Sequence, residues 1–163
     1  MNTPNAVGTH FADNSLLFTI TDNGSQSTSQ IMAECRKRFE VHSYLVDNEL
    51  DRQFPAPQEV TSRKFQKVVE ADEEYKNMSA NDLEIKGLSG ITLRERLLME
   101  LAYFDETSQH LDIDNITLCN GSRNSDGLVP SVGWSSDLSG FFVCWYGAGY
   151  SASLLRSRVA VSC

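Results

Sequence analysis

The segment Gly90–Asp112, GITLRERLLMELAYFDETSQHLD, carries the clearest structural signal in this chain of 163 residues. Thr92 and Glu95 match the S/T-x-x-E pattern of a capping box, which marks the N-terminus of a helix. Apolar side chains then recur at helical spacing and define one face: Leu93, Leu97, Leu101 and Phe104, widened by Leu98 and Ala102. Charged side chains are assigned to the outer face: Arg94, Glu95, Glu100, Asp105 and Glu106. We therefore expect a core helix over Thr92–Gln109 that buries Leu97 and Leu101.

The sequence after Asp112 changes to a period of two, which is typical of strands. Segments rich in Gly, Ser, Asn and Asp separate the alternating stretches, as turns require. Four strands are predicted: NITLC (115–119), VPSVGW (129–134), GFFVCWY (140–146) and LLRSRVAVS (154–162). Their spacing predicts an antiparallel meander packed on the preceding helix.

The N-terminal part, residues 1–54, has the pattern of a β-α-β segment. SLLFTIT (15–21) is rich in strand-forming residues. Ser27 and Gln30 then fit a second capping box, and EVHSYLV (40–46) alternates as a strand does.

Residues 55–87 are expected to join this part to the C-terminal part, residues 88–163. Pro55 and Pro57 disfavour a helix, so FPAPQEV (54–60) predicts a linker or crossing segment. A helix is then predicted over Ser62–Lys76, followed by a short capped turn of helix that Gly87 closes. The three parts together predict one compact α+β domain.

Composition excludes several classes of protein. The chain is 40% hydrophobic, enough for a core, yet it holds no apolar run near the roughly 18 residues of a membrane span. The N-terminal sequence has neither a basic start nor an apolar stretch, so no signal peptide is predicted and a cytoplasmic location is expected. The four cysteines share no CxxC or CxxH spacing, which favours reduced thiols over zinc.

The net charge of −8 is concentrated in the middle of the chain, where residues 55–114 hold seven basic and thirteen acidic side chains. We name as the acidic belt Glu70, Asp72, Glu73 and Glu74. Such a surface repels nucleic acid and attracts a partner protein with a basic surface. The alternative is that the charge provides solubility alone.

The turn Asn120–Gly127 and the aromatic residues that follow it are the candidate recognition surface. Aromatic rings supply contact area, and short polar side chains supply adaptable hydrogen bonds. The candidate ligand- or partner-binding residues are Arg123, Asn124, Asp126, Trp134, Tyr146 and Tyr150. Such a surface suits a sugar, a nucleotide or a protein loop. The alternative is that the tryptophans belong to the core.

No catalytic residue, metal or cofactor is predicted. The chain contains no GxxxxGK[ST], and no GxGxxG that opens a helix. Cys119 or Cys144 could meet His110 or His42, but the apolar neighbours of both cysteines indicate packing thiols. A calcium site could gather Asp112, Asp114, Asn124 and Asp126. Ordinary turn chemistry explains these residues better, because the EF-hand spacing is missing.

Three tail segments, LCNGSRNSDG, VPSVGW and LRSRVAVS, resemble the closing part of small uncharacterised proteins of bacteriophages and prophages. The resemblance covers roughly residues 88–162 and implies no particular activity. The tail is also similar to C-type-lectin-like modules, with Gly121, Ser122 and Arg123 at the position of their R-G-G-S-W motif. Arg156 to Val161 then stands at the position of their final strand. This likeness implies binding of carbohydrate or protein.

The sequence therefore predicts a small acidic cytoplasmic binding protein of the phage or mobile-element type, located in the host cell. It would act stoichiometrically, by occupying a host protein with a basic surface or by sequestering a small polar ligand, without direct contact to nucleic acid or membrane. Two alternatives are a lectin-like module of a virion and a small enzyme that uses Cys119 or an Asp/His pair. The sequence predicts no oligomeric state.

Overall fold

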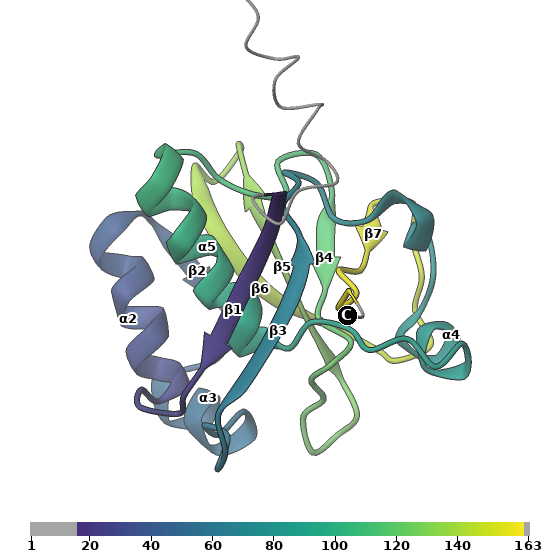
Figure 1. Cartoon of the computed structure of the whole chain (residues 1–163), viewed down its shortest axis with the longest axis horizontal. Coiled ribbons are helices and arrows are strands. Elements are labelled where there is room, and N and C mark those ends of the chain that lie inside the picture. Colours follow the sequence, from purple (N-terminus) through teal and green to yellow (C-terminus); the bar gives the residue numbers. More distant parts are fainter. Residues whose placement is uncertain (1–15, 162–163) are drawn as a thin grey trace, which may run out of the picture.

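The computed structural model describes residues 16–161, and these form an α+β fold (Figure 1). The helices are α2 (Thr28–Arg38), α3 (Asp47–Gln53), α4 (Ala80–Ile85) and α5 (Leu93–Thr107), with a 3₁₀ turn η2 (Glu73–Tyr75). The strands are β1 (Leu17–Asp22), β2 (Val41–Ser43), β3 (Thr61–Gln66), β4 (Ile116–Leu118), β5 (Val129–Ser135), β6 (Gly140–Tyr146) and β7 (Leu155–Arg156). The predicted α+β class is thus confirmed.

The larger sheet has the strand order β2-β6-β5-β4-β7. Its centre is the predicted antiparallel meander β4-β5-β6. Its edges differ from the prediction, because β2 lies parallel to β6 and β7 lies parallel to β4. The last strand is only two residues long, and the chain beyond it makes single bridges from Ser157 to Asp72 and from Val159 to Gly90.

The smaller sheet pairs β1 with β3 antiparallel, with Phe18 opposite Phe65. The predicted order strand, helix, strand is present as β1, α2 and β2, although β1 and β2 join different sheets. One prediction is wrong here: the helix expected over Ser62–Lys76 is the strand β3, followed by a loop and the turn η2. The spacing of the apolar residues after Phe65 imitated a helix. The segment forms a strand because pairing with β1 provides hydrogen-bond partners for backbone groups of β1 that would otherwise be unpaired.

Helix α5 confirms the prediction from the opening segment in its position and in its capping box at Thr92. Leu97 is fully buried, while Leu101 is only half-buried. The assignment of Arg94, Glu95 and Glu100 to an outer face is wrong, since all three are buried. The reason is that α5 contacts both β1 and β5, so neighbours cover it on more than its apolar face.

The two faces of the larger sheet bury different cores. The main core lies with α2 and α5 and includes Ile31, Leu97 and Val143. A smaller cluster on the other face joins Leu83 of α4 to Leu118 and Val129. Figure 1 shows α2 and α5 at one side of the molecule and α4 at the other. Within residues 16–161, no helix combines the length and apolar character needed to cross a membrane.

A chain of buried charges runs through the main core, centred on Asp112. The carboxylate of Asp112 accepts hydrogen bonds from Arg96 at 2.9 Å and from Arg158 at 2.9 Å. Arg96 also donates to Glu100 at 2.8 Å, and Glu100 contacts His110 at 2.8 Å. Alternating signs compensate one another, which is the condition for burying charge.

Candidate functional site

A cavity of about 600 Å³ opens beside the N-terminus of α5. Five segments line it: the end of β1, residues 53–57 from the end of α3, the start of β3, residues 88–95, and residues 120–123. Its charged lining residues are Asp22, Arg63, Arg94, Glu95 and Arg123. The volume lies within the range of about 300–1,000 Å³ that is common for small-molecule sites.

Two glycines allow the wall of this cavity to form. The amide of Gly121 donates to the carbonyl oxygen of Ile91 at 3.0 Å. A Cβ atom on Gly121 would collide with the carbonyl oxygen of Gly90, and one on Gly90 would collide with the side chain of Asn120. The segments before α5 and after β4 therefore approach more closely than residues with side chains permit.

One side of the cavity is closed by Arg63 and Glu95. Arg63 makes a bidentate pair with Glu95, with distances of 2.9 Å from Nε and 2.6 Å from Nη2. Arg63 also donates to the Ser89 hydroxyl and to the Gly90 carbonyl. These hydrogen bonds to Glu95 raise the pKa of Arg63, so the guanidinium stays charged and fixed.

A second bidentate pair, between Arg94 and Asp22, closes the side near α2. Arg94 donates to Asp22 at 2.7 Å from Nε and at 2.9 Å from Nη2. It also donates to Thr28 and to the carbonyl of Gln26. Hydrogen bonds from Arg94 hold the pKa of Asp22 below its ordinary value, so the carboxylate is ionised near neutral pH. Both cavity carboxylates are thus already paired.

Thr92, Ser122 and Asn120 of the lining have hydrogen atoms to spare, whereas the buried Oε1 of Gln53 is an acceptor without a partner among residues 16–161. The hydroxyl oxygen of Ser122 accepts from the Leu93 amide at 2.9 Å, and that of Thr92 accepts from the Glu95 amide at 3.1 Å. Because a hydroxyl can donate as well as accept, each hydrogen remains available. The Asn120 carbonyl oxygen accepts from Ser157, and its NH₂ group has no acceptor among residues 16–161.

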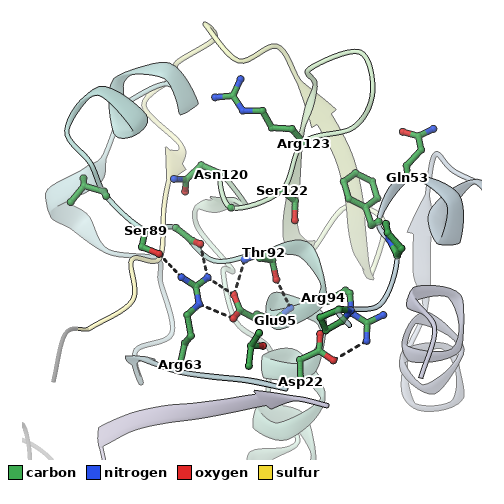
Figure 2. Close-up of a pocket in the computed structure, with 17 residues that line it drawn as sticks. Asp22, Gln53, Arg63, Ser89, Thr92, Arg94, Glu95, Asn120, Ser122 and Arg123 are labelled. Atoms are coloured by element: carbon green, nitrogen blue, oxygen red, sulfur yellow. Dashed lines mark hydrogen bonds and ion pairs between the residues drawn. The ribbon is translucent and has the colours of Figure 1, made fainter. Parts of the chain in front are cut away.

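Arg123 makes fewer hydrogen bonds than the other two arginines of the lining, Arg63 and Arg94. Its Nη2 donates to Glu84 at 2.9 Å and to Asn81 at 3.4 Å, both on α4. Its Nε and Nη1 have no partner within the described part of the chain. The Glu84 side chain is 74% exposed, so the pair lies at the surface. Figure 2 shows Arg123 apart from the Arg63–Glu95 pair, with Asn120 and Ser122 between them.

The structure does not bring all the predicted recognition residues together. Trp134 lies opposite Phe141 and Tyr146 lies opposite Val129, at the two ends of the β5–β6 hairpin. Paired residues share a face and alternate along a strand, so Trp134 and Tyr146 point to opposite faces of the sheet. Trp134 instead stacks on His110 at 3.6 Å between ring centroids, and Trp145 stacks on Phe54.

The other predicted residues fall near α4 or serve their own turn. Asn124 accepts from the amides of Asp126 and Leu128, so its side chain shapes the loop. Asp126 is exposed. Tyr146 and Tyr150 stack with their ring centroids 4.9 Å apart. Of the six candidate residues, only Arg123 lines the cavity.

The acidic belt is not a uniform exposed surface. Glu73 and Glu74 are exposed, but Asp72 is buried and accepts from the Val159 amide at 3.0 Å. The carboxylate of Glu70 accepts from the amides of Ile113, Asp114 and Asn115, so it holds the loop before β4. Two of the four belt residues thus have structural contacts.

The cysteines and the calcium candidates are placed away from the cavity. Cys35, Cys119 and Cys144 are free thiols, and burial raises the pKa of Cys119 well above its ordinary value. Asp112 is committed to two arginines. Within residues 16–161, no three His, Cys, Asp or Glu side chains group as metal ligands would.

No protein-family model, curated protein or solved structure matches this chain. The site is therefore interpreted from its own geometry. Sequence reasoning identified the turn that supplies Asn120, Ser122 and Arg123, but it missed Arg63 and Arg94. Their partners lie 32 and 72 residues away, and no local pattern signals such pairs.

Proposed function

We propose that this protein is a stoichiometric binding protein that holds a small polar ligand in the cavity at the N-terminus of α5. The observation that carries the proposal is the cavity itself, which is of ligand size and mixes Phe54, Pro55 and Pro57 with several polar groups. Small-molecule sites combine apolar walls with fixed polar groups, and the mainly polar residues that line this cavity suit a polar ligand.

The chemistry of the lining favours binding over catalysis. Among the described residues that line the cavity there is no histidine and no cysteine. The two carboxylates, Asp22 and Glu95, are each held by an arginine. General acid–base or nucleophilic catalysis needs a group able to exchange a proton or attack a substrate, and paired carboxylates are poor at both.

The remaining parts of the sequence-based hypothesis stay predictions. These are the cytoplasmic location, the likeness to phage-encoded proteins and to lectin-like modules, and a host protein with a basic surface as a partner. The exposed glutamates Glu73 and Glu74 support attraction to a basic surface, but they lie outside the cavity lining.

The test is a pair of tryptophan substitutions on β3. Thr61 lines the cavity, whereas Gln66 is exposed at the far end of the same strand. A panel of small polar metabolites is screened for a rise in the melting temperature, since a ligand that binds the native state stabilises it. We expect at least one compound to stabilise the wild type and Gln66→Trp but not Thr61→Trp. The proposal fails if no compound stabilises the protein, or if Thr61→Trp responds as the wild type does.

A further inference from the structure

We infer that the ligand carries a phosphoryl group, and that Arg123 leaves Glu84 to bind it. The inference rests on the proposed function and names the chemical class of the ligand. It follows from three observations: which donors of the cavity are unused, which acceptors are already used, and how weakly Arg123 is held.

Most of the unused groups among the described lining residues are donors, and Oε1 of Gln53 is a buried acceptor without a partner there. The hydroxyls of Thr92 and Ser122 accept from backbone amides and keep their own hydrogens. The NH₂ group of Asn120 and the Nε and Nη1 groups of Arg123 have no acceptor among residues 16–161. These groups come from the capping residue of α5 and from one short turn after β4, so they share one part of the cavity wall.

The strong acceptors of the cavity are occupied. Glu95 accepts from Arg63 and from the Thr92 amide, and Asp22 accepts from Arg94 and from the Gly24 amide. A ligand rich in donors, such as an amine, would find no unpaired carboxylate. A ligand rich in acceptors satisfies the unused donors, and a phosphoryl group offers three strong acceptor oxygens where a carboxylate offers two.

The charges of the lining also favour a negatively charged ligand. Arg63 and Arg94 are neutralised by carboxylates of the lining, whereas Arg123 is paired with Glu84, which lies outside the cavity lining and is exposed. The N-terminus of α5, a helix of 15 residues, adds its positive end. The cavity therefore favours an anion although the whole chain has a net charge of −8.

Arg123 is the most weakly held of the three arginines that line the cavity. Exposed ion pairs contribute little, because water screens them and ordering two long side chains costs entropy. The side chain of Arg123 is 32% exposed and that of Glu84 is 74% exposed. A phosphoryl group offers a guanidinium two parallel hydrogen bonds. Exchange of Glu84 for the ligand thus replaces a weak contact with a stronger one.

The test uses both members of the pair, because they should change binding in opposite directions. Arg123→Gln should weaken pyrophosphate binding at least tenfold, the equivalent of about 1.4 kcal/mol. Glu84→Gln should strengthen it by about two- to fivefold, since the competing negative charge is removed. A merely structural role would give the two variants the same effect. Arg36→Gln and Asp47→Asn, which break a surface pair outside the cavity lining, are the matched controls.

Isothermal titration calorimetry with pyrophosphate, inorganic phosphate, acetate and glycerol measures these effects. Binding of the two phosphates, with opposite shifts in the two variants, supports the inference. Preference for acetate would indicate a carboxylate ligand, and equal binding of glycerol would indicate a neutral ligand. Either outcome overturns the inference about the phosphoryl group but does not contradict the proposed function. If Thr61→Trp binds pyrophosphate as the wild type does, the inference fails. The metabolite panel tests the proposed function separately.

Discussion

Asp112 shows how a single residue can hold distant segments together. It adopts a left-handed backbone conformation with φ of 55°, its two oxygens accept from Arg96, Arg158 and Thr117, and it also accepts from the Ala71 amide. In the sequence it stands in LDIDN, where an aspartate is typical of a turn. Its burial could not be predicted because all four partners are supplied by segments outside its own loop.

Asp112→Asn should lower the free energy of unfolding by about 3–5 kcal/mol, because it leaves Arg158 buried without its counter-charge and Arg96 with Glu100 alone. Asp114→Asn is the matched control, since Asp114 is exposed and two residues further on. Urea denaturation of both variants measures the difference. Equal stability of the two variants would contradict the role assigned to Asp112.

In contrast to Asp112, Asp72 should destabilise the folded protein at neutral pH. Burial raises its pKa, and one of its oxygens has no partner among the described residues. Because the pKa is raised in the folded state, the contribution of Asp72 to stability is fully present below its unfolded pKa of about 3.9. That contribution is lost as the pH rises through its folded pKa.

Asp72→Asn should therefore raise the free energy of unfolding at pH 7, by on the order of 1 kcal/mol. The difference from the wild type should shrink as the pH falls toward 4, where Asp72 itself becomes neutral. Glu73→Gln, an exposed neighbour, should show neither effect. Thermal unfolding at the two pH values decides the matter, and a destabilised Asp72→Asn protein at pH 7 would refute the prediction.

At the scale of elements, the sequence predicted the features that depend only on neighbouring residues. The capping boxes at Ser27 and Thr92 and the period-two strands β5 and β6 follow from neighbouring residues, and all are present. The pairing of β1 with β3 and the position of β2 beside β6 could not be predicted, because they depend on contacts between remote segments. The cavity was missed for the same reason, since five separate segments build it.

Gly121→Ala should lower the free energy of unfolding by about 1–3 kcal/mol, the range for an overpacked site. The added Cβ meets the backbone of Gly90 and Ile91, which cannot move aside as a side chain can. Gly147→Ala provides the control, because a Cβ there has nothing within 4 Å. Chemical denaturation measures both, and a stable Gly121→Ala protein would show that the two segments can separate without cost.

On the scale of the whole molecule, the predicted parts 1–54, 55–87 and 88–163 are tied together by contacts across their boundaries. The sheet β1-β3 joins the first two parts. Arg158 donates to the carbonyls of Val68 and Val69 and to Asp112, which joins the last two.

Unfolding should therefore be a single cooperative transition. Tryptophan fluorescence and far-ultraviolet circular dichroism should give the same midpoint in urea, as they do for two-state domains. Trp134 and Trp145 report the larger sheet, whereas circular dichroism also reports the helices. Two separated midpoints would mean that the parts unfold independently.

Because Trp145 stacks on Phe54, the intrinsic fluorescence of Trp145 can report on the cavity. The two rings lie 5.4 Å apart and almost parallel, and Phe54 is also part of the cavity wall. A compound that enters the cavity changes the surroundings of Phe54 and, through it, the emission of Trp145. Trp134, four residues along β5 from the partner of Trp145 and stacked on His110, serves as the internal reference. Unlabelled protein, with Trp134→Phe or Trp145→Phe to separate the two signals, can thus be titrated directly in a fluorimeter.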